Sequence, residues 1–318
     1  MKIVFFGTNE FAVVSLEALC NSRHELAAVV TQPDRKKGRG LKLAFPPVKV
    51  FAEKRGLKTY QPSLLKEKSF IRELSKISPD LVIVVSYGKI LPKEILDIAG
   101  IYAVNLHASL LPKYRGAAPV NWAIINGETE TGIAIIKMNE HMDQGDILTN
   151  RKVEIEPEDT AGSLSDTLAR IGADSLLETI DLIEKGKVVQ LSQDDRAASF
   201  APRIKKDDAR IDWSKSSVEL FNFVRGMNPH PGAFTYIGEK LVKIWKVKSL
   251  SAPEGYSAGE LLDSGKEQGI VVSTGKGCLL ITELQLEGKK RMGLHSRPDH
   301  DVHAGPRAAD EDRAEDGR

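Results

Sequence analysis

Five consecutive apolar residues, Leu81 to Val85, constrain the fold of this 318-residue chain more than any other stretch. A run with no polar position has no solvent-facing side, which is typical of a strand covered on both faces in a parallel sheet. Similar short runs alternate with amphipathic helical patterns through the first half of the sequence. We therefore predict a doubly wound, mostly parallel α/β domain over residues 1–190.

The second half has a different pattern. Residues 191–205 are polar and predict a linker. Residues 206–293 contain one helical pattern and then short strands separated by glycine and proline, which predicts a smaller C-terminal β-barrel domain. An OB-like barrel is one form, and such barrels often bind oligonucleotides. Residues 203–293 carry 15 Lys/Arg against 11 Asp/Glu, a bias that an ordinary solvated surface would also show.

The last segment, residues 294–318, has no lysine and carries 4 Arg against 7 Asp/Glu. Leu294 and Val302 are its only large apolar residues, so it cannot bury a core and we expect disorder. The pair His300 and His303 is a poor metal site in a flexible tail. We interpret the segment as a non-native end, such as the result of a frameshift.

Composition restricts the class of protein. Hydrophobic residues make up 41% and charged residues 28% of the chain, and the net charge is +1. These values are ordinary for a soluble globular protein. The two cysteines, Cys20 and Cys278, are too few for a disulfide framework and suggest a reducing compartment. The apolar run Ile3 to Phe6 is too short for a signal peptide or a membrane span, so we predict a cytoplasmic protein.

Polar side chains interrupt one predicted strand near its end. Asn105 and His107 are two residues apart and should point to the same face. Asp143 follows another predicted strand, and the carboxyl ends of parallel strands meet at one edge of a sheet. Buried hydrogen bonds alone would also explain these residues. As an active site, they would supply acid–base and oxyanion-stabilising groups.

Other chemistries find less support in the sequence. No GxSxG motif surrounds Ser109, and a metal would need more His or Cys nearby than His141. Gly7 is the only glycine of GTNEFA, so a Rossmann-like dinucleotide site is weakly supported. We expect Gly7 to form a tight turn and Thr8 or Asn9 to cap the following helix. Direct acyl or one-carbon transfer without a covalent or metal intermediate is the chemistry that remains.

Several motifs carry a family resemblance. They are GTNEFAVVSLEAL, TQPDRKKGRG, NLHASLLPKYRGAAP, M-x-x-x-x-D-x-G-D at 138–146, and RIDW at 210–213. In this order they resemble the formyltransferase family that uses 10-formyltetrahydrofolate, over residues 1–292. The resemblance implies that Asn105, His107 and Asp143 are catalytic. It also implies that the folate co-substrate lies against two short segments, Gly88, Lys89, Ile90, Leu91 and Ser109, Leu110, Leu111, Pro112.

The resemblance is greatest to members that formylate the methionine carried by initiator tRNA, and it implies a tRNA surface. Residues 33–49 contain six Lys/Arg and one acid, which ordinarily means a solvated loop. In this family they imply a loop that enters the acceptor stem, with Arg39 as the main contact. The implied tRNA-binding residues are Arg35, Lys36, Arg39, Lys42, Arg203, Lys205 and Lys206. We expect a monomer with no metal and no membrane contact.

Three alternatives remain open at this stage. The acceptor could be a small amine, such as a nucleotide-linked glycinamide or an amino sugar. The same three residues could hydrolyse formyl-folate when no amine is bound. A non-catalytic RNA-binding protein that uses only the barrel would leave Asn105, His107 and Asp143 unexplained.

Overall fold

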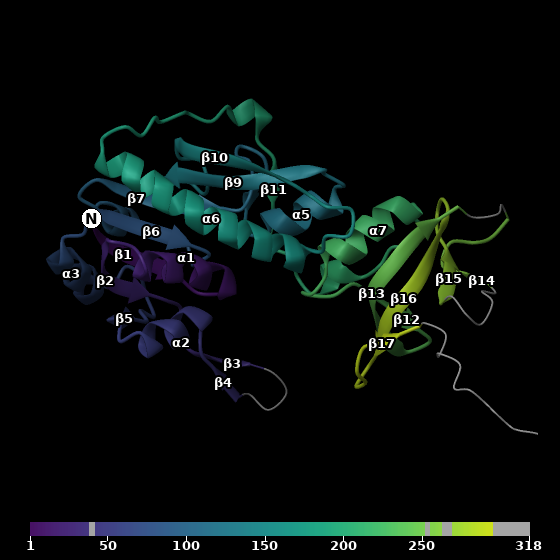
Figure 1. The fold of residues 1–318 in the computed structure, drawn as a ribbon. Helices are drawn as coiled ribbons and strands as arrows, with labels where there is room; N and C mark the ends of the chain where they lie inside the picture. The colour runs from purple at the N-terminus through teal and green to yellow at the C-terminus, as the bar shows by residue number, and fades with distance from the viewer. Residues whose placement is uncertain (38–41, 252–254, 263–268, 295–318) are drawn as a thin grey trace, which may run out of the picture.

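The computed structural model describes residues 1–37, 42–251, 255–262 and 269–294, which form two domains of unequal size (Figure 1). The larger domain is built on a seven-stranded sheet with the order β10-β9-β7-β6-β1-β2-β5. The strands are β1 (Lys2–Gly7), β2 (Glu25–Val30), β5 (Thr59–Tyr60), β6 (Leu81–Val85), β7 (Tyr102–His107), β9 (Glu130–Lys137) and β10 (Ile147–Glu154).

The first five of these strands run parallel, whereas β9 is antiparallel to both β7 and β10. The apolar run of β6 alternates between two cores. Ile83 and Val85 pack in one core with residues of four helices, while Val82 and Val84 pack in a second core on the other face. Helices thus cover both faces, and the predicted doubly wound, mostly parallel sheet is confirmed.

The helices of this domain connect the strands and shield the sheet from water. They are α1 (Glu10–Cys20), α2 (Pro47–Lys54), α3 (Lys68–Ile77), α4 (Lys93–Leu96), α5 (Pro119–Ile125) and α6 (Ala161–Glu184). Asn9 caps α1 by accepting a 3.3 Å hydrogen bond from the backbone N–H of Ala12, as predicted from the sequence. A short hairpin of β3 (Arg35–Lys37) and β4 (Lys42–Ala44) extends from the domain (Figure 1).

The smaller domain consists of α7 (Ser217–Gly226) packed against an antiparallel sheet that forms a half-barrel. Its core includes Leu220 and Val224 of the helix and Ile244 and Leu279 of the sheet. The expected C-terminal β domain is confirmed. The strands are β12 (Phe234–Ile237), β13 (Lys240–Leu250), β14 (Leu261–Leu262), β15 (Ile270–Ser273), β16 (Cys278–Leu286) and β17 (Met292–Gly293).

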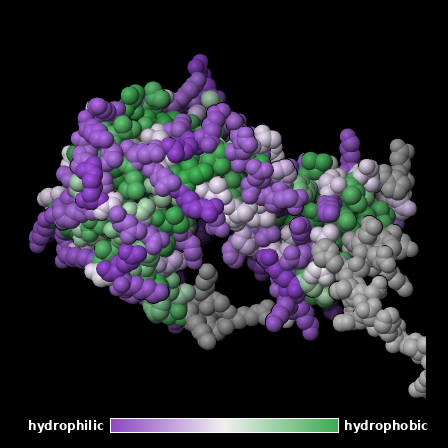
Figure 2. Space-filling view, in the orientation of Figure 1, coloured by the Kyte–Doolittle hydropathy of each residue, from purple (hydrophilic) through white to green (hydrophobic). Residues whose placement is uncertain are grey.

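The two domains contact each other through α5 and α7. Asn121 donates a 2.8 Å hydrogen bond to the carbonyl of Gly226, and Arg225 donates one of 3.2 Å to the carbonyl of Asp159. A Cβ on Gly226 would lie 2.5 Å from the side chain of Ile125, so glycine permits this close approach. Figure 2 shows a hollow between the two domains in this view, with hydrophilic side chains gathered on the C-terminal side of it.

The C-terminal end of the described chain packs on the small domain. The backbone N–H of Leu294 donates a 2.8 Å hydrogen bond to the carbonyl of Thr282, and its side chain packs against the core. Leu294, the residue after β17, is therefore fixed against the small domain. Residues 295–318, with His300 and His303, lie outside the described residues. Among the described helices, none combines the length and apolar character that crossing a membrane requires.

Candidate active site

The end of β7 presents two polar side chains to one carboxylate. Asn105 donates from Nδ2 to Oδ1 of Asp143 at 3.3 Å. His107 Nδ1 lies 3.6 Å from Oδ2 of the same residue. The side chains of His107 and Asp143 are only 6% and 13% exposed. The prediction that Asn105 and His107 share one face of a strand is confirmed, and both meet Asp143 there.

Asp143 does not reach this site by the route expected from the sequence. The expectation of parallel strand ends is wrong for β9, because β9 is antiparallel to β7 and its last residue, Lys137, pairs with Val104. The loop between β9 and β10 instead returns Asp143 to the end of β7. Asp143 has a positive φ of 55°, and a Cβ on Gly145 would lie 1.7 Å from the carbonyl oxygen of Lys137. The DQGD sequence thus permits a tight turn that closely approaches β9.

His107 is held by a backbone group on its far side. Its Nε2 lies 2.9 Å from the carbonyl oxygen of Tyr114. Because a carbonyl can only accept, Nε2 carries a proton, and Nδ1 is the ring nitrogen that faces Asp143. The hydroxyl of Tyr114 donates to Glu128 at 2.8 Å. Burial, followed by that carboxylate, raises the pKa of Tyr114 to about 12, so this tyrosine stays neutral as a structural support.

The segment expected to be a linker lies along the active site. Figure 1 shows the chain after α6 running back past β10 to β11 (Phe200–Ala201). Along this path Leu191 forms two backbone hydrogen bonds with Ile147, and β11 pairs in parallel with β8 (Arg115–Gly116). Sequence reasoning missed these contacts. We name residues 190–201 the strap, because they hold the turn before α5 together with residues 143–145, which we call the candidate catalytic loop.

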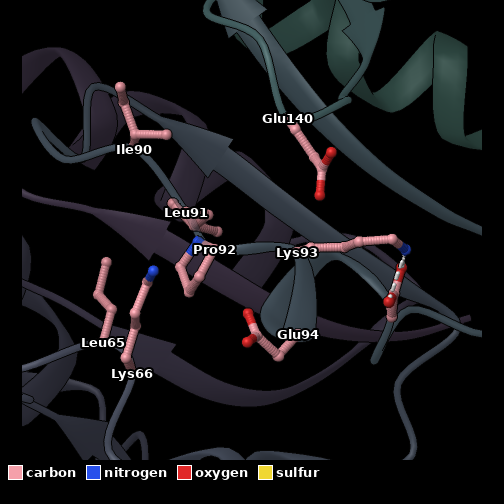
Figure 3. A pocket seen from close by; sticks show the side chains of 9 residues that line it. Leu65, Lys66, Ile90, Leu91, Pro92, Lys93, Glu94 and Glu140 are labelled. Atoms are coloured by element: carbon pink, nitrogen blue, oxygen red, sulfur yellow. Dashed lines mark hydrogen bonds and ion pairs between the residues drawn. The ribbon is translucent and has the colours of Figure 1, made fainter.

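A cavity of about 650 Å³ opens beside α4, and Figure 3 shows its lining. Ile90 and Leu91, two of the predicted folate residues, line it together with Lys66, Lys93 and Glu140. Lys93 donates to Asp97 at 2.7 Å, so its charge is already paired. Ile90 is 66% exposed and offers an apolar surface next to these charged groups. Such a mixed wall suits a flat ligand with an apolar ring system and polar edges.

The other predicted folate residues are absent from the lining of this cavity and have different local roles. Gly88 has a φ of 84°, and an added Cβ would meet open space. Lys89 donates to the carbonyl of Ser63 at 3.3 Å. Ser109 donates to the carbonyl of Lys113 at 2.6 Å, and Leu111 packs in a small core with residues of β9 and β10. The second predicted segment, Ser109, Leu110, Leu111 and Pro112, therefore lies outside the cavity lining.

The predicted tRNA residues occupy two separate places. Arg35 and Lys36 are exposed on β3, and Arg35 donates to Gln32 at 3.2 Å. Lys42 begins β4, while Arg39 lies outside the described residues, so its predicted role is not located. On the other domain, exposed Lys205 and Lys206 precede the short helix η2 (Asp207–Ala209). Arg203 is also exposed, just after the strap.

A further basic cluster lies on the half-barrel and was missed from the sequence. The guanidinium of Arg291 lies 3.5 Å from the ring centre of Trp245, and the ammonium of Lys243 lies 5.3 Å from it. Burial, and then the charges of Lys206 and Arg291, lower the pKa of Lys243. Glu283 lies 3.8 Å from Arg291 and partly balances it. The cluster brings Lys206 close to Lys243 and Arg291. Lys243 and Arg291 are distant in sequence, and strand pairing in the sheet brings them together.

Two family models match this chain. A formyl transferase model matches residues 1–180, and a model of the formyl transferase C-terminal domain matches residues 203–297. The chain belongs to the formyl transferase family. The resemblance drawn from the sequence motifs is thereby confirmed. Within the described residues, no group of three or more His, Cys, Asp or Glu could hold a metal ion.

A curated relative indicates the branch of the family to which this chain belongs. A curated methionyl-tRNA formyltransferase from Geobacter sulfurreducens is 46% identical over 292 residues, covering 92% of this chain and 91% of the relative. This similarity confirms the predicted methionyl-tRNA branch of the family and its transferase chemistry.

Solved structures share the fold at lower identity. The sugar 3N-formyl transferase WlaRD, crystallised in the presence of dTDP and 5-N-formyl-THF, has a TM-score of 0.65 at 23% identity, covering 91% of this chain and 99% of its own. A methionyl-tRNA formyltransferase from Clostridium thermocellum has a TM-score of 0.56 at 18% identity, covering 78% and 93%.

Proposed function

We propose that this chain transfers the formyl group of 10-formyltetrahydrofolate to the free amino group of initiator methionyl-tRNA, which yields formylmethionyl-tRNA for translation initiation. The observation that carries the proposal is the meeting of Asn105 and His107 at the Asp143 carboxylate, in a chain 46% identical to a methionyl-tRNA formyltransferase. Asn105, His107 and Asp143 are the proposed catalytic residues. The reaction takes place in the bacterial cytoplasm, and the chain acts as a monomer.

Asn105 and His107 act on the formyl oxygen. When the amine attacks the formyl carbon, a C–N bond forms and negative charge collects on that oxygen. One N–H of Asn105 faces Asp143 at 3.3 Å, and its second N–H is free to donate to the developing oxyanion. Because Tyr114 holds Nε2 of His107, the protonated imidazole contributes through its Nδ1–H.

Asp143 acts on the surplus proton of the attacking amine. Its carboxylate lies beside both groups and accepts a 2.9 Å hydrogen bond from the backbone N–H of Gly116. It takes up the amine proton, directly or through one water molecule. The oxyanion then reforms the carbonyl, the bond between the formyl carbon and N10 of the folate breaks, N10 receives the proton that Asp143 took up, and the formyl group remains on methionine.

The substrates are assigned to surfaces on either side of these residues. We place the folate against Gly88, Lys89, Ile90 and Leu91 at the cavity, where Ile90 offers an apolar face. Residues 109–112 contribute through their backbone, because Leu111 is held in a core. The tRNA would contact Arg35, Lys36, Arg39 and Lys42 on one domain. It would contact Arg203, Lys205 and Lys206 on the other, extended by Lys243 and Arg291.

Formyl transfer to charged initiator methionyl-tRNA tests the proposal directly. We expect the wild type to transfer labelled formyl from 10-formyltetrahydrofolate. We expect His107→Ala to be slower by roughly 10²–10⁴-fold, the usual contribution of a positioned acid–base group, with tRNA binding unchanged. Formate release or formylation of a small amine by the wild type, without transfer to the tRNA, would overturn the acceptor assignment.

The tRNA surface has its own test. The dissociation constant for initiator tRNA should rise steeply with salt, because each neutralised phosphate contributes roughly 0.7–0.9 to the slope of log K against log salt. Replacing Lys205 and Lys206 together by alanine should reduce that slope by about 1.5 and leave the transfer rate at saturating tRNA unchanged. An unchanged slope would remove both lysines from the proposed surface.

A further inference from the structure

One side chain of the strap contacts the catalytic loop from outside. Gln193 is partly buried in a stretch whose neighbours Ser192 and Asp194 are exposed. Its Nε2 donates to two backbone carbonyls of the loop, those of Asp143 at 2.8 Å and Gly145 at 2.7 Å. Both carbonyls flank the tight turn that carries the catalytic carboxylate.

The other end of the same amide is fixed as well. Oε1 of Gln193 accepts hydrogen bonds from Arg115, from Nε at 3.1 Å and from Nη2 at 2.8 Å. Arg115 is only 3% exposed, and its guanidinium also pairs with Asp195 of the strap at 2.8 Å. The amide nitrogen and the amide oxygen of Gln193 therefore both have hydrogen-bond partners, and these partners fix the orientation of the side chain.

These contacts close a ring through the active site. Arg115 is followed by Gly116, whose backbone N–H donates to Oδ2 of Asp143 at 2.9 Å. The carboxylate is thus linked through Gly116 to Arg115, from Arg115 to Gln193, and from Gln193 back to the carbonyl of Asp143. The guanidinium of Arg115 donates to the amide oxygen of Gln193 and to Asp195. It therefore helps to orient the loop without forming an ion pair with the carboxylate of Asp143.

The catalytic loop needs such support. Asp143 adopts a φ of 55°. This backbone conformation is unfavourable for a residue with a Cβ, so it persists only where surrounding contacts enforce it. The side-chain oxygens must stay within about 0.5 Å of their working positions for efficient proton transfer. A displacement of about 1 Å can reduce a rate by roughly 100-fold.

We infer that Gln193 is a positioning residue for formyl transfer, acting on Asp143 through the backbone of residues 143–145. The inference rests on the proposed function of Asp143. It assigns this role to Gln193 alone among the residues of the strap. Gln193 does not contact the reacting atoms, and its effect passes entirely through the position of the Asp143 carboxylate.

The test compares variants of the full chain under single-turnover conditions with excess enzyme. Gln193→Leu removes the amide at similar size, and we expect the transfer rate to fall 10- to 100-fold. The KM for the folate and the dissociation constant for tRNA should change less than twofold. Gln193→Glu retains the side-chain oxygen that accepts from Arg115. It replaces the donating amide nitrogen with an oxygen, which would face the carbonyls of Asp143 and Gly145. It should show the same rate loss in a protein whose melting temperature is preserved.

Gln190→Leu is the matched control, because Gln190 is a glutamine of the same strap. It bridges β7 and β9 by hydrogen bonds with the Tyr102 hydroxyl at 3.0 Å and Lys137 at 3.4 Å, but does not contact the catalytic loop. We expect its transfer rate to stay within twofold of the wild type. A loss equal to that of Gln193→Leu would assign the effect to the strap as a whole and overturn the specific role of Gln193.

A double-mutant cycle separates positioning from general support. If Gln193 acts through the Asp143 carboxylate, Gln193→Leu should change the residual rate of Asp143→Asn by no more than twofold. Equal losses in both backgrounds, or no loss in the wild-type background, would overturn the inference. Failure of the wild type to formylate methionyl-tRNA would instead overturn the proposed function, so the two failures are distinguishable.

Discussion

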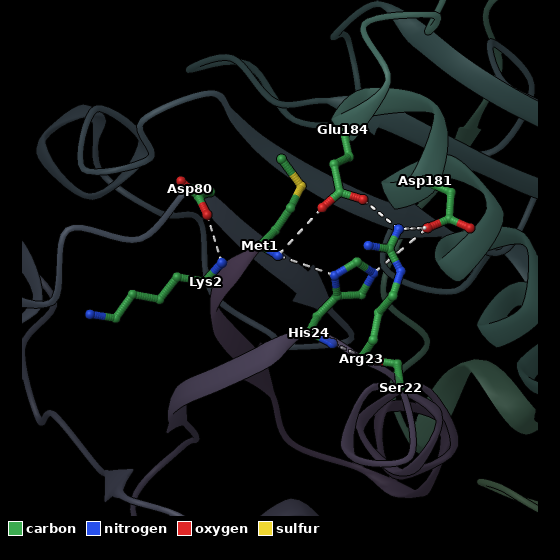
Figure 4. A network of polar contacts seen from close by, with 8 residues as sticks. All are labelled: Met1, Lys2, Ser22, Arg23, His24, Asp80, Asp181 and Glu184. Carbon is green, nitrogen blue, oxygen red and sulfur yellow. Dashed lines mark hydrogen bonds and ion pairs between the residues drawn. The ribbon is translucent and has the colours of Figure 1, made fainter.

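Two buried histidines of this protein lie beside carboxylates, but their surroundings differ. His107 is 6% exposed and 3.6 Å from Asp143, and His24 has a side chain that is 3% exposed and 3.9 Å from Asp181. Judged by burial and distance alone, the two pairs are alike. Figure 4 shows the second pair within a network that joins the start of β1, the turn before β2 and the end of α6.

The charges around His24 are already paired. Arg23 bridges Asp181 and Glu184, with 2.6 Å to Asp181, and the Met1 ammonium group lies 3.3 Å from Nδ1 of His24. Burial, then the Met1 ammonium and Arg23, lower the pKa of His24 despite the nearby carboxylates. This histidine is a neutral acceptor within a structural network.

The carboxylate beside His107 has neutral donors instead. Asp143 accepts from the side-chain amide of Asn105 and the backbone N–H of Gly116. Among the described residues, His107 is the one titratable side chain within ion-pair distance of it. The negative charge of Asp143 is therefore held in place by dipoles and remains available to an incoming amine. The comparison teaches that the charges of the neighbouring groups distinguish a histidine–carboxylate pair that is available for chemistry from one that is part of a structural network.

Matched substitutions of the two histidines should give the largest difference. We expect His107→Gln to lower kcat for formyl transfer by roughly 10²–10³-fold, because glutamine cannot bring the positive charge of the protonated imidazole to the developing oxyanion. His24→Gln should leave kcat within twofold of the wild type. Steady-state kinetics with charged initiator tRNA provide the measurement, and similar losses for both variants would break the comparison.

The backbone donor to Asp143 should have the next largest effect. Gly116 has a φ of 129°, and a Cβ there would lie 2.5 Å from the carbonyl oxygen of Ala201. We expect Gly116→Ala to lower the free energy of unfolding by about 1–3 kcal/mol and the transfer rate by about tenfold, since its N–H must move.

Gly288→Ala is the control for backbone strain, because Gly288 has a φ of 74° with nothing within 4 Å of an added Cβ. It should lower stability without changing the transfer rate. Urea unfolding and single-turnover kinetics on both variants give the two readouts. An unaltered rate in Gly116→Ala would show that this hydrogen bond does not hold the carboxylate.

The pH dependence of stability should show a smaller effect of His24. Its pKa is lower in the folded state than the unfolded value of about 6.5, so the unfolded chain binds more protons as pH falls through that value. Stability is then lost as pH decreases below about 6.5, by less than about 1.4 kcal/mol for each pH unit. Chemical denaturation between pH 7.5 and about 5 should give a shallower slope for His24→Gln than for the wild type.

The smallest predicted effect concerns the pKa of His24 itself. Arg23→Met removes a nearby cation and releases Asp181 and Glu184 from their shared partner. Both changes favour the protonated imidazole, so the pKa of His24 should rise toward its ordinary value. Titration of the ring by NMR measures this shift. A pKa that stays the same or falls would show that burial alone sets the protonation of His24.

The sequence predicted the shared face of Asn105 and His107 better than it predicted how Asp143 reaches them. Strand alternation placed Asn105 and His107 on one face because side-chain direction has a fixed period of two. Asp143 was found from its motif, but the antiparallel direction of β9 is not encoded in that motif. Gln193 was missed because it binds backbone carbonyls, which every residue has, 50 positions from Asp143. The basic cluster at Trp245 likewise depends on strand pairing between distant segments.

The path of the strap has a consequence for cutting and recombining this protein. The family model for the catalytic domain ends at residue 180, whereas the hydrogen bonds that hold the catalytic loop and the turn before α5 continue to Ala201. A chimaera that joins this domain to a different C-terminal domain should therefore retain the chain through residue 201. The contacts that complete the larger domain thus continue about 20 residues beyond the end of its family match.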